Sequence, residues 1–130
     1  MTYALPVPDD VGRRFVEAVA TQDRTALADC FVSDVLFRAL TPPGLRERTS
    51  AAEAATLVTQ WFGDSTELRL LEAQDYEIGD RRHVSYRLAG IENGEAFVVE
   101  QHLFCVVEND RIARANLLCS GFRPPTAAAD

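Results

Sequence analysis

The sequence has 130 residues, of which 47% are hydrophobic and 25% charged, and its formal net charge is −7; this is the size and composition of one globular domain. The acidic balance and the scattered basic residues argue against a nucleic-acid partner and against docking on anionic membranes, since both require clustered positive charge. No segment reaches the ~20 apolar residues that span a bilayer, and MTYALPVPDD at the start lacks the features of a signal peptide. The three cysteines are odd in number and far apart, which favours reduced thiols and a cytoplasmic location.

Two short helices are expected first along the chain. Asp9 and Asp10 follow a proline-rich start and can cap a helix whose apolar residues recur at helical spacing, at Val11, Phe15, Ala18 and Val19. Asp23 can cap a second, shorter helix that turns three side chains inward, those of Leu27, Cys30 and Phe31.

A strand and a third helix are expected next. The strand covers residues 34–40 and ends at Pro42-Pro43-Gly44, because proline lacks the amide hydrogen that a strand ladder uses. The run Arg46-Glu47-Arg48 after it is typical of solvated surface charge. Ser50 with Glu53 three residues later forms a capping-box pattern, which predicts a helix with one apolar stripe, made of Ala54, Leu57, Val58 and Trp61, and an end at Gly63.

The second half of the chain is predicted to be an antiparallel meander. Apolar-rich runs cover residues 66–78, 82–92, 95–108 and 111–122. Pairs typical of tight turns separate them, namely Gly79-Asp80, Asn93-Gly94 and Asn109-Asp110; His83 adjoins the first of these turns and is expected to be solvated. The element order predicts an α+β fold, with three N-terminal helices packed on the concave face of a curved, mostly antiparallel sheet. We expect a single domain over 1–130, with an ordered core at 10–123 and a flexible tail at 124–130.

The predicted strand at 95–108 has two apolar faces, although antiparallel strands usually alternate apolar and polar residues. One face carries Phe97, Val99, Gln101, Leu103, Cys105 and Val107. The other carries Ala96, Val98, Glu100, His102, Phe104 and Val106. If the helices cover one face, a second copy of the chain is the simplest cover for the other, which predicts a homodimer. Periodicity alone leaves open which face meets the helices.

Two long stretches and the Asn-Gly hairpin carry a family likeness: RRFVEAVATQDRTALADCFVSDVLF (13–37) and VVEQHLFCVVENDRIARANLLCSGF (98–122). They resemble the SnoaL-like and nuclear-transport-factor-2-like superfamily, which includes ketosteroid isomerase, over residues 10–123. The resemblance implies a cone with a deep pocket between sheet and helices, and dimerisation through the outer sheet face. An alignment with the isomerase implies that the pocket is faced by Glu100, His102 and Phe104 and the partner by Phe97, Val99, Leu103 and Cys105.

The candidate catalytic groups are Glu100 and His102, which lie two apart on one strand face, where a carboxylate can tune an imidazole for acid–base chemistry. A structural pair, or a pair on an exposed face, is the alternative. The resemblance implies that the pocket binds a small hydrophobic organic molecule and is lined by Phe15, Phe37, Ala39, Trp61, Tyr86, Leu88, Phe104, Leu117 and Cys119. For Tyr86 and Trp61 core packing is the alternative, and for Cys119 the alternative is a buried, unreactive thiol. No metal-ligand or cofactor motif occurs, so neither a metal nor a cofactor is expected.

The leading functional hypothesis is an acid/base enzyme of the isomerase, cyclase, dehydratase or hydrolase type. Phe15 and Ala39 occupy the positions of the isomerase's other two catalytic groups, so steroid isomerisation is not expected. The alternatives are a non-catalytic ligand-binding or dimerisation module and, less strongly supported, a protein-binding scaffold like nuclear transport factor 2 itself.

Overall fold

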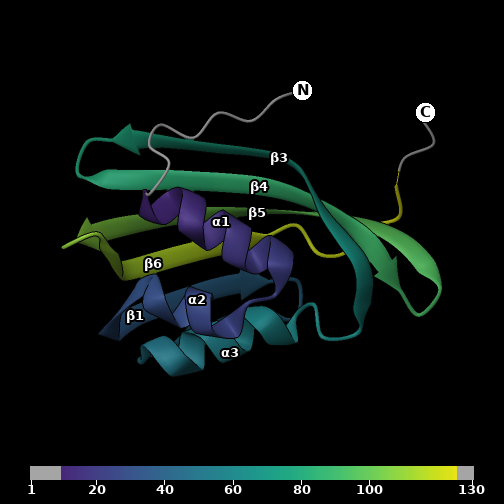
Figure 1. Ribbon diagram of the computed structural model, residues 1–130, viewed down its shortest axis with the longest axis horizontal. Coiled ribbons are helices and arrows are strands. Elements are labelled where there is room, and N and C mark those ends of the chain that lie inside the picture. Colours follow the sequence, from purple (N-terminus) through teal and green to yellow (C-terminus); the bar gives the residue numbers. More distant parts are fainter. Residues whose placement is uncertain (1–9, 126–130) are drawn as a thin grey trace.

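The computed structural model describes residues 10–125. Three helices, α1 (Val11–Thr21), α2 (Arg24–Asp29) and α3 (Ala51–Gln60), lie on one face of a curved sheet (Figure 1). The six strands are β1 (Phe31–Thr41), β2 (Gly44–Arg48), β3 (Ser65–Ile78), β4 (Arg81–Glu92), β5 (Glu95–Glu108) and β6 (Arg111–Cys119). Their order across the sheet is β2-β1-β6-β5-β4-β3, and every pair is antiparallel except β1 with β6. The predicted α+β architecture is confirmed.

Local capping and turn chemistry define where most elements begin and end. Side-chain oxygens of Asp10, Asp23 and Ser50 each accept a hydrogen bond from a backbone amide in the first turn of a helix, as N-caps do. Asn93 and Gly94 both have positive φ angles, which a two-residue hairpin turn requires. The predicted cap Asp9 lies outside the described residues, as does most of the predicted tail. No helix among residues 10–125 is long and apolar enough to cross a membrane.

The strand β2 lies where the sequence predicted solvated charge. It pairs antiparallel with β1, so that Ala39 is opposite Arg46 and Phe37 is opposite Arg48. The Pro42-Pro43-Gly44 segment therefore turns the chain into a hairpin instead of ending the sheet. Five residues with one leucine carry no apolar alternation, and for that reason periodicity does not reveal this strand.

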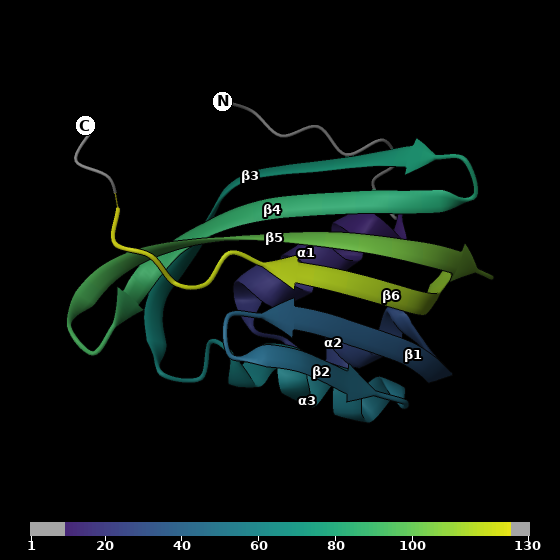
Figure 2. The ribbon, with the colours of Figure 1, turned by 180° about the vertical axis from the view of Figure 1, so that it is seen from behind.

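The face of β5 that meets the helices is the opposite of the one implied by the family alignment. Phe97, Val99, Leu103 and Cys105 are at most 5% exposed and pack in the core, so their assignment to an outer interface is wrong. Glu100 and His102 have side chains 35% and 32% exposed, and Phe104 is 40% exposed. These three lie on the sheet face that the helices leave uncovered (Figure 2), so their placement in an inner pocket is wrong. The buried face of β5 carries no carboxylate and no imidazole, so folding does not have to remove Glu100 or His102 from water.

Six residues predicted to line a central pocket instead fill the space between sheet and helices. They are Phe15, Phe37, Ala39, Tyr86, Leu88 and Leu117, each at most 3% exposed. The aromatic rings in this region are closely packed: the ring centroid of Phe15 lies 6.1 Å from that of Phe31 and 5.9 Å from that of Tyr86. The centre of the molecule is therefore closely packed.

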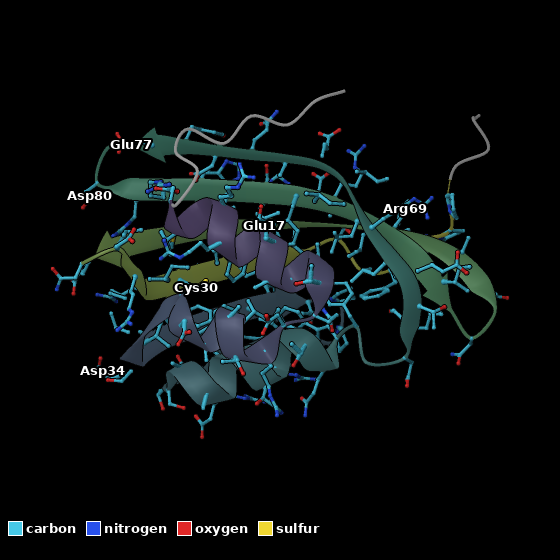
Figure 3. All side chains as sticks on the ribbon, viewed as in Figure 1. Glu17, Cys30, Asp34, Arg69, Glu77 and Asp80 are labelled. Carbon is cyan, nitrogen blue, oxygen red and sulfur yellow. The ribbon has the colours of Figure 1, made fainter. Side chains whose placement is uncertain are left out.

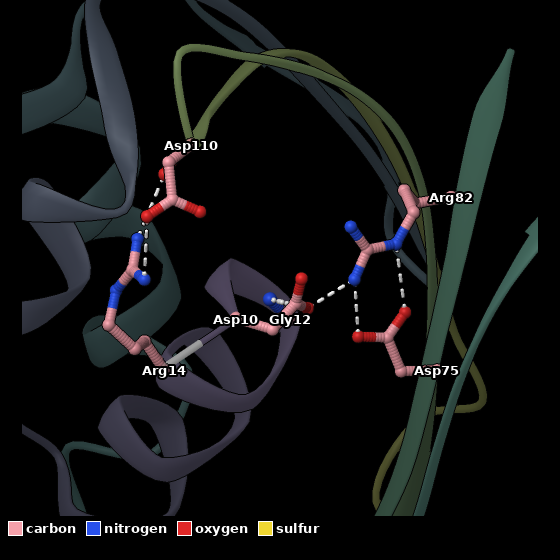
Figure 4. Close-up of polar contacts among 6 residues, drawn as sticks. All are labelled: Asp10, Gly12, Arg14, Asp75, Arg82 and Asp110. Atoms are coloured by element: carbon pink, nitrogen blue, oxygen red, sulfur yellow. Dashed lines mark hydrogen bonds and ion pairs between the residues drawn. The ribbon is translucent and has the colours of Figure 1, made fainter. Parts of the chain in front are cut away.

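An ionic cluster fixes the start of α1 to the β3–β4 hairpin (Figure 4). The guanidinium of Arg82 donates hydrogen bonds of 3.1 and 2.6 Å to the Asp75 carboxylate and another to Asp10. Burial works to raise the pKa of both carboxyls; the pKa of Asp75 stays above its ordinary value, whereas hydrogen bonds bring that of Asp10 below. A side chain at Gly12 would collide with the Asp75 carboxylate, so the close approach of α1 requires glycine at this position.

Candidate functional site

A cavity of about 440 Å³ opens where the β1–β2 hairpin, the end of α3 and the chain after β6 come together. Its walls are mostly apolar, and two arginines and a few neutral polar groups complete them. The lining residues are Thr41, Pro42, Pro43, Arg46, Arg48, Leu57, Gln60, Trp61, Cys119, Gly121 and Phe122. A concave apolar site with few polar groups is the usual form of a small-molecule site.

Cys119 forms the polar inner wall of this cavity. It is the last residue of β6, and its Sγ accepts hydrogen bonds of 3.3 Å from Nε2 of Gln101 and 3.4 Å from the amide of Gly121. Cys119 is also the only partly exposed thiol, since Cys30 and Cys105 are buried.

A hydrogen-bonded chain continues from Cys119 into the core. The Tyr86 hydroxyl donates a 2.6 Å hydrogen bond to Oε1 of Gln101, and Gln101 itself is fully buried. Burial raises the pKa of Tyr86 well above its ordinary value, so the phenol stays neutral and acts as a donor. Gln101 is absent from the predicted site; the signal for it was a single amide side chain on an otherwise apolar strand face.

The imidazole–carboxylate pair lies on the other side of the sheet and belongs to a longer chain. Nε2 of His102 is 2.7 Å from Oε2 of Glu100, and its Nδ1 is 2.9 Å from Nε2 of His83. Arg87 donates a 2.7 Å hydrogen bond to Oε1 of Glu100. The hydrogen bond with His102, joined by Arg87, holds the pKa of Glu100 below its ordinary value although burial opposes this.

His83 is buried beneath this chain, whereas the sequence predicted a solvated position. It is 6% exposed, because Phe104 stacks on its ring at 4.4 Å and Tyr76 packs edge-on at 4.8 Å between centroids. Burial, and secondarily the neighbouring His102, lowers the pKa of His83. Its Nδ1 is buried and has no hydrogen-bond partner within residues 10–125.

Two other hollows differ in character from the cavity at Trp61. A groove of about 620 Å³ lies between the first two helices and β3, and its charged lining residues are Arg14, Glu17, Asp23 and Asp29; Figure 3 shows Glu17 on α1. A cleft of about 130 Å³ on the outer face includes Gln74, Arg87, Glu100 and His102. Both have acidic side chains in their walls, which the lining of the cavity at Trp61 lacks. Within residues 10–125, no three histidine, cysteine or acidic side chains are grouped to hold a metal ion.

Solved structures match this arrangement over most of its length. A nuclear-transport-factor-2-like protein from Burkholderia thailandensis superposes with a TM-score of 0.68 at 15% identity, covering 89% of this chain and 92% of the other. The chain has the nuclear-transport-factor-2-like fold. A putative polyketide cyclase from Xanthomonas campestris pv. campestris gives a TM-score of 0.67 at 21% identity, covering 83% of this chain and 86% of that one.

This nuclear-transport-factor-2-like fold also occurs in a structure with a bound small molecule. A hypothetical ketosteroid isomerase-like protein from Catenulispora acidiphila, in complex with trimethylamine, has a TM-score of 0.69 at 14% identity, covering 82% of each chain. No protein-family profile and no curated protein matches the sequence. At these identities the likeness establishes the fold, which hosts unrelated activities.

Within this fold, the predicted site residues separate into three groups. Trp61 and Cys119 line the 440 Å³ cavity. Phe104 joins Glu100 and His102 on the outer face, where the predicted contact between the acid and the imidazole exists. The other six predicted lining residues are in the closed core. Whether Trp61 and Cys119 contact a ligand stays a prediction.

Proposed function

We propose that this protein binds a small, largely apolar organic molecule in the cavity formed by the β1–β2 hairpin, α3 and the end of β6. The observation that carries the proposal is the cavity itself, whose volume of about 440 Å³ falls within the range of small-molecule sites. Leu57, Trp61 and Phe122 supply apolar contact area. Cys119, backed by the Gln101–Tyr86 hydrogen bonds, supplies a polar contact at the inner end.

Binding without acid/base catalysis is the form of the proposal that the cavity favours. Within residues 10–125, its lining includes no carboxylate and no imidazole. An acid/base role for Glu100 and His102 is a second candidate and requires a substrate at the outer cleft that they share with Gln74 and Arg87. The observation in its favour is the 2.7 Å contact between imidazole and carboxylate, a pairing suited to proton transfer.

Trp61 provides the test of the binding proposal, because it is the only tryptophan in the sequence and lies in the cavity wall. Titration with octan-1-ol should change its fluorescence and raise the melting temperature, since a ligand that binds only the folded state stabilises it. Cys119→Phe should fill the cavity and abolish both effects. Leu71→Phe adds the same ring at an exposed position on β3, away from the cavity, and should leave them intact. Octanol binding to Cys119→Phe and the wild type with equal affinity would refute the proposed site.

The outer sheet face is proposed as a homodimer interface. Three leucines form a continuous row across neighbouring strands, with Leu40 paired to both Leu45 and Leu118. They are 50%, 62% and 50% exposed respectively. An apolar row of this kind on a sheet face free of helices favours a symmetric contact with a second copy. The free thiols support a cytoplasmic location, which stays a prediction.

A further inference from the structure

The strand β2 places its leucine on the outer face and its two arginines on the helix side, where Arg46 is exposed and Arg48 is half-buried. Arg46 and Arg48 are opposite Ala39 and Phe37 on β1, and both of those residues are fully buried on the helix side of the sheet. The arginines therefore lie on the helix side. Leu45 is 62% exposed. A strand at a sheet edge normally turns its apolar residue to the core and its charges to water.

Both arginines line the 440 Å³ cavity. Arg48 donates a 2.8 Å hydrogen bond from Nη1 to the backbone oxygen of Glu47. No ion pair found among residues 10–125 includes either of them. On the outer face of the same hairpin, by contrast, Arg38 is paired with Glu47 at 2.7 Å. Glu53 and Arg48 line a shallow hollow beside the cavity without forming an ion pair.

We propose that the ligand of this cavity is an amphiphilic carboxylate, whose anionic group binds to Arg46 and Arg48 and whose apolar part lies against Leu57, Trp61 and Phe122. This inference rests on the proposed binding function and adds the chemical class of the ligand. Two residues apart on a strand, the arginines stand on one face about 6–7 Å from each other. Guanidinium groups at this spacing can each direct a planar fork of donors toward one carboxylate.

The protein as a whole is acidic, so the two arginines in the cavity wall are informative about the charge of the ligand. The chain carries 20 acidic and 13 basic residues, so its average field repels an anion. An anionic ligand consequently needs a local source of positive potential, and the cavity wall has two cationic groups and no carboxylate among the residues that line it. The apolar part of the lining lowers the local dielectric constant, which strengthens charge-assisted hydrogen bonds.

The test compares octanoate with octan-1-ol, which share one apolar chain and differ in charge. Trp61 fluorescence in the full-length protein should show octanoate binding about tenfold or more tightly than octanol, as expected for hydrogen bonds to a charged group. The double variant Arg46→Gln/Arg48→Gln should lose this preference and bind octanol as the wild type does. Arg114→Gln, on the outer side of β6, is the matched control and should retain the preference. High salt should weaken octanoate binding to the wild type and leave octanol binding unchanged.

Two results overturn the inference, and they differ in what they imply for the binding proposal. Equal affinity of the wild type for both probes, or an unchanged preference in the folded double variant, removes the carboxylate assignment and leaves the apolar site intact. If neither octanol nor octanoate binds, both the carboxylate assignment and the binding proposal are removed. If circular dichroism shows that the double variant does not fold, Arg46→Gln alone and the salt dependence of the wild type decide the question.

Discussion

The Tyr86 hydroxyl and the Gln101 carboxamide are joined by a 2.6 Å hydrogen bond inside the core, with exposed fractions of only 2% and 0%. Each side chain comes from a different strand, β4 or β5, and each satisfies a polar group that would otherwise be buried alone. Gln101 also reaches Cys119 at the cavity. The pair therefore connects the stability of the sheet with the geometry of the candidate site.

Removal of the Tyr86 hydroxyl should destabilise the protein. Tyr86→Phe leaves Oε1 of Gln101 buried without a donor, which costs about 1–3 kcal/mol in free energy of unfolding. Gln101→Leu should have a similar cost, because it leaves the phenol without an acceptor. The double variant should cost less than the sum of the two, since no unpaired group of this hydrogen bond then remains. Urea unfolding of all four proteins measures this coupling, and strictly additive values would contradict it.

The orientation of His102, the residue after Gln101, was predicted wrongly from the family likeness. Alternation sorted most of residues 95–108 correctly into two faces, and the pairing with β6 shifts register between Val106 and Val107. A shift of one residue in an alignment moves every side chain to the other face, and so the family likeness put His102 inside in place of Gln101. The simpler criterion was sufficient: the face with no charged residue is the face in the core.

Caps and turns were predictable because their chemistry is local, whereas the cavity was not. Asp23 and Ser50 each cap a helix through an amide three residues away, so both partners lie close together in the sequence. The cavity instead depends on β2, whose pairing with β1 has no periodic signal in five residues. The predicted solvated charge agrees with the exposure of Arg46, and Arg48 is half-buried; only the register of the hairpin shows that both lie on the helix side.

Thiol chemistry provides an independent probe of the cavity. Burial raises the pKa of Cys30 to about 11 and that of Cys105 to about 12, which suppresses the reactive thiolate at neutral pH. Cys119 is the partly exposed thiol. We expect Ellman's reagent to modify one thiol rapidly in the native protein and three in denaturant. Cys119→Ser should remove the rapid phase, and octanoate should slow it in the wild type; rapid modification of all three native thiols would contradict this expectation.

A charge in the leucine row should prevent association. Leu118→Glu places a carboxylate in the proposed interface, where a desolvated charge without a partner is costly, so light scattering should give a dimer mass for the wild type and a monomer mass for the variant. Thr25→Glu adds the same charge on the exposed side of α2 and should remain dimeric. Leu103→Glu is unsuitable as a test because Leu103 is fully buried and its loss should unfold the subunit. A monomeric wild type would refute the proposed interface.

The hydrogen bond between His102 and Glu100 should be visible in the titration of the carboxyl group. Because His102 is the main cause that lowers the pKa of Glu100, His102→Gln should raise that pKa toward its ordinary value, with Arg87 still opposing part of the rise. A lowered pKa in the folded state stabilises the protein above the unfolded-state pKa, and this stability is lost as pH falls through the folded-state value. Carbon-13 NMR of the Glu100 side chain measures the shift, and an unchanged pKa in His102→Gln would show that the contact is not maintained in solution.

Folding stability should decrease in mild acid because of His83. Its pKa lies below the ordinary value of 6.5 in the folded state, through burial and then through His102, so near and below 6.5 the unfolded chain binds more protons than the folded one. The free energy of unfolding should therefore fall as pH decreases from about 7 through this range. His83→Phe should fit between Phe104 and Tyr76. It leaves the other side chains on this face in place, including His102, Arg81 and Tyr76. The free energy of unfolding of this variant should therefore depend less steeply on pH. Urea unfolding between pH 7.5 and pH 5 compares the two proteins, and parallel curves would show that His83 is not the group responsible.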